Sequence, residues 1–272
     1  MNIPFGHHEL HNKYIFDGEL KILTPVRLAM GIASDETDAP FMRDYSGIPY
    51  IPGSSLRGAI RSEIERIVSA LDETKTGVTA CISFERGNCA EKIKKFQKGL
   101  DSNLDEETVD QQLTKFMENN ICDLCKLFGT AGYASRIFFE DCKLIEASPA
   151  KVIRDGVGID RDTGAAKDGA KFDYEVIEKG SFTFKMTVEN LDRNNDSADY
   201  KLVKLVLALL EEGLFVGGKR SSGLGKIKLK PKYSVTGFEE PDILWERILA
   251  GKELYDTIAW GQEESNAETK TV

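Results

Sequence analysis

The segment at residues 48–61, IPYIPGSSLRGAIR, constrains the fold most, because it joins a turn rich in proline and glycine to the start of a helix. Ser54 belongs to the residue types that cap helices, and the apolar residues after it follow the spacing of one buried stripe. A second glycine-rich segment, 215–226, lies far downstream and is also basic. Glycine lets a backbone approach a ligand closely, so the two segments together indicate a surface for a polyanion.

The basic residues of these segments are candidates to hold phosphate groups. The first segment carries Arg57 and Arg61, one helical turn apart. In the second, Lys219 and Arg220 follow two glycines in an order that does not match a P-loop, although backbone N–H groups in such a turn can still bind phosphate. A tight turn between a helix and a strand is the alternative interpretation of this second segment.

Hydrophobic periodicity predicts four strands and two main helices. The strands are expected at 19–30, with a break near Pro25, and at 135–145, 181–189 and 223–231, and the helices at 54–68 and 198–212. The order strand, helix, strand, strand, helix, strand is that of the ferredoxin-like arrangement, which RNA-recognition modules share. We therefore expect an α+β fold with a ferredoxin-like, RNA-recognition-motif-like core.

Three segments lie outside this pattern, within what we expect to be a single domain at 1–272. Residues 72–126 break the periodicity and indicate an insertion with one helix around 109–117. Residues 147–178 are polar and glycine-bearing, which is typical of a hairpin. Residues 233–272 are expected to form an acidic C-terminal extension with a short helix at 243–248.

The composition indicates a folded chain without a membrane segment. Of 272 residues, 41% are hydrophobic and 30% charged, and no apolar run reaches the length of about 18 residues that a spanning helix needs. The N-terminus lacks a secretory pattern, so we expect a cytoplasmic location and no membrane partner. The net charge of −9 argues against nucleic-acid binding by the whole surface, but basic residues gather near the glycine-rich segments and at 226–230.

Four of the five cysteines form two pairs in or beside the insertion. Cys81 and Cys89 are separated by seven residues, and Cys122 and Cys125 by two. Because disulfides are rare in chains that are not exported, four thiolates at such spacing favour a structural zinc site. Free buried thiols are the alternative, and Cys142, in an expected strand, is assigned to the core.

An acidic loop precedes the first glycine-rich segment. It contains Asp35, Glu36, Asp38 and Asp44. Such a loop can hold Mg²⁺ or activate a nucleophile, and a simply solvated loop is the alternative.

A turn sequence at 158–165, GIDRDTGA, predicts a hairpin tip. Ile159 is an apolar residue on this expected excursion, so we interpret it as a wedge against a partner or a base.

The motifs together resemble a known family. The runs DAPFMRD at 38–44 and IPYIPGSSLRG at 48–58 are similar to the backbone subunit of type III CRISPR effector complexes, in the RAMP superfamily. Further matches are CKLFG at 125–129, the segment 159–161, Glu175 before the expected strand, and the glycine-rich loop at 217–225. The cysteine pairs and the insertion resemble the zinc-bearing subunits of some type III variants, whereas the acidic C-terminal extension has no match in the family pattern.

The resemblance implies a role in an RNA-guided complex. Such subunits stack as further copies of themselves along a guide CRISPR RNA, beside other CRISPR effector subunits, and a thumb-like hairpin separates the guide from the target RNA. In this family an Asp after the first strand cleaves target RNA with a divalent ion, Mg²⁺ or Mn²⁺, and leaves a cyclic phosphate. Asp38 matches that residue by its spacing to IPGSS, and Asp35 is the reserve.

The resemblance also implies a set of RNA-contacting residues. They are Arg43, Ser54, Ser55, Arg57, Arg61, Ile159, Arg161, Gly217, Gly218, Lys219, Arg220 and Ser221. The metal-binding set would be Cys81, Cys89, Cys122 and Cys125.

Two other functions remain open from the sequence. The first is a structural filament subunit that binds guide RNA without cleaving its target. The second is a stand-alone RAMP-type ribonuclease that processes precursor guide RNA without a divalent ion. It would need a general base such as His8 or His11, although a surface patch is the favoured interpretation of the run HHELH at 7–11, over a base or a metal ligand.

Overall fold

The computed structural model describes residues 9–71, 73–101, 103–145, 151–230 and 232–260. His7 and His8, with the rest of residues 1–8, lie outside the described residues, as do 72, 102, 146–150, 231 and 261–272.

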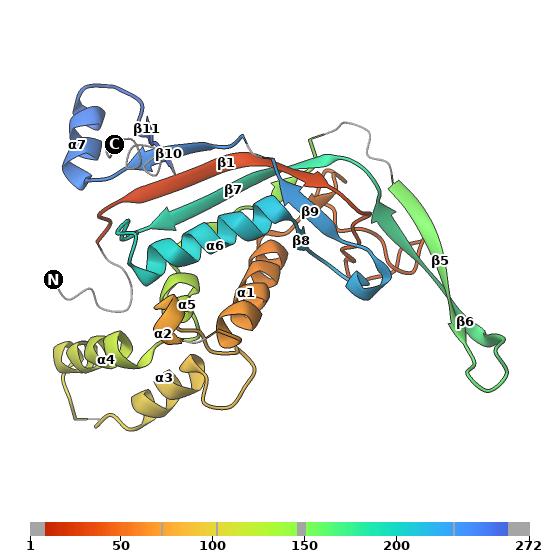
Figure 1. Ribbon diagram of the computed structural model, residues 1–272, viewed down its shortest axis with the longest axis horizontal. Coiled ribbons are helices and arrows are strands. Elements are labelled where there is room, and N and C mark those ends of the chain that lie inside the picture. Colours follow the sequence, from red (N-terminus) through yellow and green to blue (C-terminus); the bar gives the residue numbers. More distant parts are fainter. Residues whose placement is uncertain (1–8, 72, 102, 146–150, 231, 261–272) are drawn as a thin grey trace, which may run out of the picture.

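A seven-stranded antiparallel sheet forms the centre of the molecule (Figure 1). Its strands are β1 (Lys13–Ile22), β3 (Ile137–Phe139), β7 (Ser181–Glu189), β8 (Leu214–Phe215), β9 (Lys226–Leu229), β10 (Ser234–Phe238) and β11 (Asp256–Thr257). β7 pairs with β1 on one side and with β3 on the other. The opposite edge of β1 is shared, because β10 pairs with its first half and β9 with its last three residues.

Two helices, α1 (Gly53–Ser69) and α6 (Ala198–Glu212), pack on the same face of this sheet (Figure 1). Alternate residues of the two central strands point at the helices and are buried: Tyr14, Phe16, Leu20 and Ile22 from β1, and Phe182, Phe184, Met186 and Val188 from β7. The period of two places all of them on one side of the sheet. Burying each such side chain contributes about 1.5–3 kcal/mol, so this layer determines the position of everything attached to it.

The expected bounds were right for β7 and α6 and wrong for the first strand. β1 ends at Ile22 instead of continuing to Met30, and the chain then crosses to other segments through isolated bridges such as Val26 to Ile177. The expected Ser54 cap is also wrong. Pro52 takes the cap position with no side-chain hydrogen bond, and the Gly53 N–H donates to Asp141 Oδ1 at 2.8 Å.

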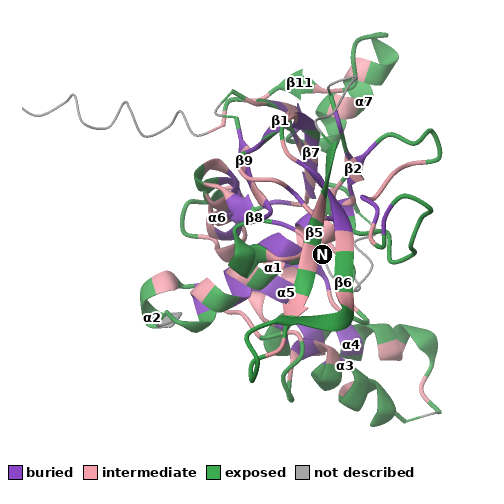
Figure 2. Ribbon diagram, turned by 90° about the vertical axis from the view of Figure 1, so that its right-hand side faces the viewer, coloured by how far each residue is buried: buried purple, intermediate pink, exposed green. Residues whose placement is uncertain are grey.

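A long hairpin leaves the body of the molecule (Figure 1). It consists of β5 (Lys151–Ile159) and β6 (Ala166–Ile177), paired antiparallel. Figure 2 shows that most of it is exposed or intermediate, and the buried residues are the last four of β6, at its base. The start of the expected hairpin, at 147–150, lies outside the described residues.

A helical unit lies on the other side of the molecule from the hairpin (Figure 1). It comprises α2 (Glu73–Thr76), α3 (Cys89–Lys98), α4 (Glu106–Asn120) and α5 (Asp123–Phe128). Asn88 and Asp105 cap α3 and α4 by accepting from the N–H of Glu91 and Thr108. Of these helices the sequence predicted only α4, and it predicted no separate core. The unit nevertheless has a small core of its own.

The C-terminal segment begins with a strand of the central sheet. β10 pairs with β1, and α7 (Pro241–Leu249) follows it.

A short pair of strands, β2 (Tyr50–Ile51) and β4 (Cys142–Lys143), holds the chain before α1. None of the helices in the described ranges combines the length and the apolar character that crossing a membrane requires.

Candidate RNA-binding and metal sites

The base of the hairpin brings together three segments that are far apart in the sequence. Side chains of β6 alternate there, and Asp173 and Glu175 contact the loop that precedes β2. Phe172 and Tyr174, at the intervening positions, contact the glycine-rich turn. Because successive residues of a strand face opposite sides, one strand serves both contacts.

Asp38 is held by reciprocal hydrogen bonds with Asp173. The Asp38 N–H donates to Asp173 Oδ1 at 2.8 Å, and the Asp173 N–H donates to Asp38 Oδ2 at 3.0 Å. The Thr37 hydroxyl also donates to Asp173 Oδ1 at 2.6 Å. Hydrogen bonds from Thr37 and Asp38 lower the pKa of the Asp173 carboxyl. Asp38 is exposed and Asp173 is half-buried, and each carboxylate has a second oxygen that takes part in none of these hydrogen bonds.

Arg43 and Glu175 fasten the same loop more deeply. Glu175 is only 4% exposed, accepts from the Phe41 N–H at 2.8 Å, and forms an ion pair with Arg43. Arg43 also donates to the Gly47 carbonyl at 3.0 Å. The Arg43 side chain is thus engaged inside the protein, and its contact with RNA stays a prediction.

The glycine-rich turn packs against the other side of the hairpin base. The Gly218 N–H donates to the Arg27 carbonyl at 3.0 Å, and a Cβ at Gly217 would overlap that carbonyl. Lys219 adopts the left-handed conformation, with φ of 58°, and its Nζ lies 4.4 Å from the Phe172 ring centre and 4.5 Å from that of Tyr174. These cation–π contacts orient Lys219 beside the hairpin.

The remaining residues of the turn continue toward α1. Arg220 and Ser221 are exposed in a 3₁₀ turn, η1 (Arg220–Ser222). Arg220 lines a hollow together with Glu63 and Arg66 of α1. The second glycine-rich segment thus approaches the later turns of α1, which lie beyond the first segment at 48–61.

Arg57 and Arg61 of α1 do not line that hollow. Arg57 donates to the Phe128 carbonyl, and Arg61 donates to the Gly129 carbonyl at 2.6 Å. Ser54 is exposed and Ser55 half-buried at the start of the helix. The structure gives both arginines a role in fixing α5 to α1, and RNA contacts of all four residues remain predictions.

The outer part of the hairpin presents apolar side chains to solvent. Ile159 is 56% exposed and Val157 47%, while Arg161 is exposed in the tip turn. Exposed apolar residues on a two-stranded projection suit insertion between partners, as a wedge requires. Ile159 thus lies exposed near the end of the hairpin, and its role as a wedge stays a prediction.

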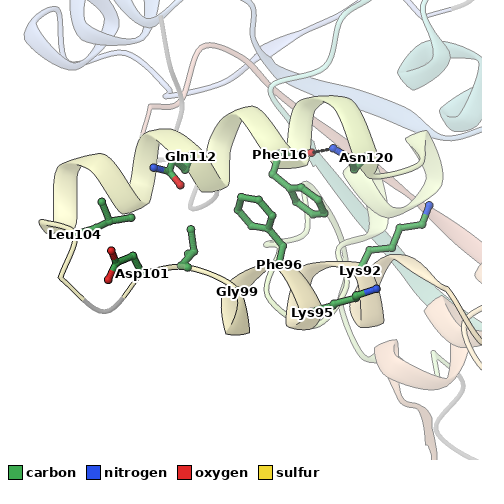
Figure 3. Close-up of a pocket in the computed structure, with 10 residues that line it drawn as sticks. Lys92, Lys95, Phe96, Gly99, Asp101, Leu104, Gln112, Phe116 and Asn120 are labelled. Carbon is green, nitrogen blue, oxygen red and sulfur yellow. Dashed lines mark hydrogen bonds between the residues drawn. The ribbon is translucent and has the colours of Figure 1, made fainter.

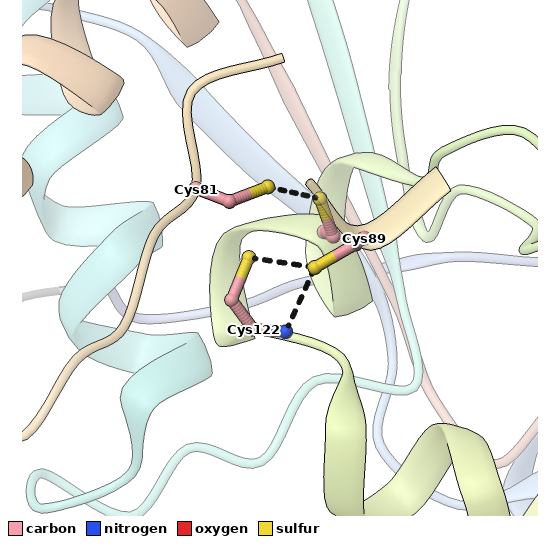
Figure 4. Close-up of side chains that lie close together, drawn as sticks. Cys81, Cys89 and Cys122 are labelled. Atoms are coloured by element: carbon pink, nitrogen blue, oxygen red, sulfur yellow. Dashed lines mark hydrogen bonds between the residues drawn. The ribbon is translucent and has the colours of Figure 1, made fainter. Parts of the chain in front are cut away.

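Four cysteines converge from separate segments (Figure 4). They are Cys81, Cys89, Cys122 and Cys125, and their sulfur atoms all lie within 4.8 Å of one another. The Cys81–Cys125 and Cys89–Cys122 sulfur distances are 3.6 and 3.5 Å. Ligands of a tetrahedral zinc ion at 2.3 Å are about 3.8 Å apart, so the donor set fits such an ion. Cys142 is buried elsewhere, as expected.

The cysteine cluster is bound to α1 through a buried ion pair. Arg61 Nη2 donates to Cys125 Sγ at 3.0 Å, and Arg61 Nε donates to Glu65 at 2.8 Å. Glu65 in turn accepts from the Ser83 hydroxyl at 2.6 Å, two residues after Cys81. Such outer contacts orient metal ligands and adjust their charge.

Several of these partners could not be found in the sequence. Asp173 showed no motif, and Glu175 was noted only as a family match without a structural role. The Lys219 contacts with Phe172 and Tyr174 join residues more than forty positions apart. The alternation of aromatic and acidic residues at 172–175 was the one available signal.

The other candidates lie apart from this arrangement. Asp35 is exposed in the loop before Asp38, and His11 is exposed at the start of the described chain with a contact to Glu9 at 3.5 Å.

Comparison with known sequences defines the class. Residues 19–228 match the sequence model of the RAMP superfamily, and the chain belongs to that superfamily. Among its relatives is the CRISPR system Cms endoribonuclease Csm3 of Methanothermobacter thermautotrophicus, 26% identical over 80% of this chain and 83% of that protein. Proteins with the same name from Streptococcus thermophilus and Methanocaldococcus jannaschii are 26% and 25% identical, over 83% and 81% of this chain and 93% and 80% of their own.

Proposed function

We propose that this protein is a guide-RNA-binding backbone subunit of a type III CRISPR effector complex and that it cleaves complementary target RNA. The observation that carries the proposal is the junction at the base of the projecting hairpin, where Asp38 packs on one side of β6 and the basic turn on the other. The relatives named as Csm3 endoribonucleases support the same activity. Guide RNA, target RNA, other effector subunits and further copies of this chain would be the partners.

Asp38 would be the catalytic residue, with Asp173 as its neighbour. Mg²⁺ is commonly held by one or two carboxylates together with substrate phosphates, and the exposed carboxylate of Asp38 lies beside the half-buried carboxylate of Asp173 here. A bound divalent ion would stabilise the charge that develops on the phosphate. The 2′-hydroxyl oxygen of the target would attack the adjacent phosphorus, and the 5′-oxygen would leave, which yields a 2′,3′-cyclic phosphate.

The basic turn would hold the guide strand. Lys219 and Arg220, with the N–H groups of Gly217 and Gly218, are placed to contact phosphates. Ile159 would separate guide and target at the tip of the hairpin. Arg161 would add a phosphate contact there.

Zinc would occupy the cysteine cluster and hold the helical unit to α1. The sulfur spacing and the absence of competing oxygen ligands in the donor set favour zinc over harder ions. The core would be ferredoxin-like, which the strand order β9, β1, β7, β3 and the two helices on one face support.

The experiment uses the assembled complex with a labelled complementary target RNA. The proposal predicts cuts at regular intervals that disappear when EDTA removes the divalent ion and return with Mg²⁺. Bound but uncut target would indicate a purely structural subunit. Cleavage of precursor guide RNA by the isolated chain in EDTA would indicate the processing ribonuclease instead. Sequencing of the RNA that co-purifies should give small RNAs with one constant repeat-derived end.

A further inference from the structure

Arg27, in the segment after β1, lies at the base of the hairpin with no protein partner for its charge. It is half-buried, its guanidinium carbon lies 5.1 Å from the centre of the Tyr174 ring, and its Nε atom is buried without a hydrogen-bond partner. Among the arginines of the described ranges that are not exposed, only Arg27 has neither a side-chain hydrogen bond nor an ion pair. Partial burial of an unpaired charge is costly, so this guanidinium indicates an anionic ligand from outside the chain.

A second cation lies beside the same ring. Lys219 Nζ is 4.5 Å from the centre of the Tyr174 ring. Within the described residues, no carboxylate forms an ion pair with Lys219 or with Arg27. Two positive charges beside one ring repel each other, and an anion bound to both removes that repulsion. The pair therefore favours a ligand with negative charge.

Contacts with the glycine-rich turn fix both cations at this place. The Gly218 N–H donates to the Arg27 carbonyl at 3.0 Å, and a Cβ at Gly218 would lie 3.0 Å from Arg27 Nη1. Glycine at this position therefore lets the guanidinium lie close to the turn. Lys219 is the next residue, so one backbone connection holds both cations. An anion that binds them requires little further ordering of the site.

The surroundings favour a phosphate of single-stranded RNA over a free anion. Phe172, beside Lys219, is 37% exposed, and a Cβ at Gly156 of the paired strand would overlap its ring. Glycine at 156 thus leaves room for this ring against the hairpin. Aromatic rings beside cations hold the bases and the backbone of single strands. Arg220, exposed in the same turn, extends the positive charge beyond what one free anion would need.

We propose that Arg27 and Lys219 together bind one backbone phosphate of the RNA beside Tyr174. The identity of this ligand rests on the proposed function, and the inference adds Arg27, which no sequence motif indicated. Asp38 contacts the opposite side of β6 through Asp173, so the phosphate site is separate from the candidate cleavage site.

The test titrates a labelled single-stranded RNA with the full chain, freed of nucleic acid, at several salt concentrations. Arg27→Met and Lys219→Met should each weaken binding about tenfold at low salt. The slope of log affinity against log salt should become less steep by about 0.7 in each, as expected for one phosphate contact on a single strand. The double variant should lose less than the product of the two single losses, because both residues hold the same phosphate.

Stability separates this role from a structural one. Because the charge of Arg27 has no partner in the protein, Arg27→Met should leave the urea midpoint of the RNA-free chain unchanged or raise it. A lower midpoint would assign Arg27 to the fold and contradict the inference.

Arg86→Met and Lys95→Met are matched controls, because both replace exposed cations of the helical unit, away from the hairpin. Lys95 lies at one end of the apolar groove between α3 and α4 (Figure 3). Both controls should keep the RNA affinity and the salt slope of the unaltered chain.

The outcomes distinguish this inference from the proposed function. Unchanged affinity and salt slope in the Arg27 variant would overturn the inference alone, whereas an unaltered chain that binds no RNA would overturn both. Losses that multiply in the double variant would place Arg27 and Lys219 at different phosphates and refute the shared site.

Inorganic phosphate provides the arm for a free anion. If it raises the Tm of the unaltered chain but not that of the Arg27 variant, while both bind RNA equally, the site holds a free anion and the assignment to RNA is wrong. We expect RNA binding to differ between the two chains at every salt concentration at which the unaltered chain binds.

Discussion

The Arg43 guanidinium and the Glu175 carboxylate form an ion pair that joins the loop after β1 to the base of the hairpin. The Glu175 side chain is 5% exposed and that of Arg43 is 25% exposed. The pair therefore holds the loop with Asp38 against the base of the hairpin. Removing one partner leaves a charge in a largely water-free place.

Arg43→Ala should lower the free energy of unfolding by about 3 kcal/mol, because it leaves the Glu175 carboxylate buried without its cation. The double variant Arg43→Met with Glu175→Gln should recover part of this loss, since no buried charge remains. Urea unfolding measures both. Arg66→Ala is the control: Arg66 is 74% exposed in its pair with Glu63, so the change should cost less than about 1 kcal/mol. Equal effects at the two sites would contradict the assigned burial of charge.

Metal removal should loosen the helical unit selectively. Chelation, or Cys89→Ser, should increase hydrogen exchange of α3, α4 and α5 while the amides of β1 and β7 stay protected, because the cysteines link separate segments. Elemental analysis should give one zinc per chain before chelation. Cys142→Ala is the control, because that thiol is buried outside the cluster. Metal-free protein with unchanged exchange would exclude a structural metal.

Arg61→Met should weaken zinc binding by about tenfold or more, because it removes a cationic donor from Cys125 Sγ and frees Glu65. Competition with a coloured chelator measures the change. Arg57→Met tests whether any α1 arginine has this effect, since Arg57 contacts the Phe128 carbonyl and a ring instead of a sulfur. Identical zinc affinity in the Arg61 variant would refute the outer-contact role.

Tyr14 should make stability fall at alkaline pH. Burial, followed by the nearby Glu239 carboxylate, raises the pKa of Tyr14 from 10.0 to about 12. A pKa raised by folding adds stability that is complete below pH 10 and is lost as the pH rises from 10 to 12. The loss amounts to about 2 to 3 kcal/mol.

Denaturant unfolding between pH 8 and 12 measures this loss, and Tyr14→Phe should flatten the curve. Burial also raises the pKa of Tyr233 to about 12, so part of the decline should remain in that variant. A variant with the same alkaline slope as the unaltered chain would show that Tyr14 does not contribute.

The sequence was informative where burial follows a simple period. The alternation from Phe182 to Val188 and the helical spacing from Leu202 to Leu210 gave the bounds of β7 and α6, because both elements face one core. β10 was missed, since its acidic surroundings and Gly237 hid a strand that pairs with β1 and β11. α3 was missed because it has only two buried residues, Cys89 and Ile93, among several lysines, so its apolar periodicity is weak.

The sequence likewise predicted only part of the candidate sites. The spacing of the cysteines was enough to predict the four-cysteine cluster, because the type and number of candidate ligands can be read directly from the sequence. The contacts of Asp38 with Asp173 and of Arg43 with Glu175 span more than 130 residues, and only the folded chain defines them. Arg57 and Arg61 were expected at a phosphate, and their internal contacts depend on where α5 ends.

Target cleavage by a complex that contains Asp38→Asn tests the central claim most directly. Asparagine keeps the oxygen that accepts from the Asp173 N–H, so the loop should stay in place while the anionic ligand is lost. Asp35→Asn, in the same exposed loop, is the matched control. We predict a cleavage rate at least about 100-fold lower for the Asp38 variant, with target binding intact and the control unaffected. Cleavage at the unaltered rate by the Asp38 variant would contradict the account.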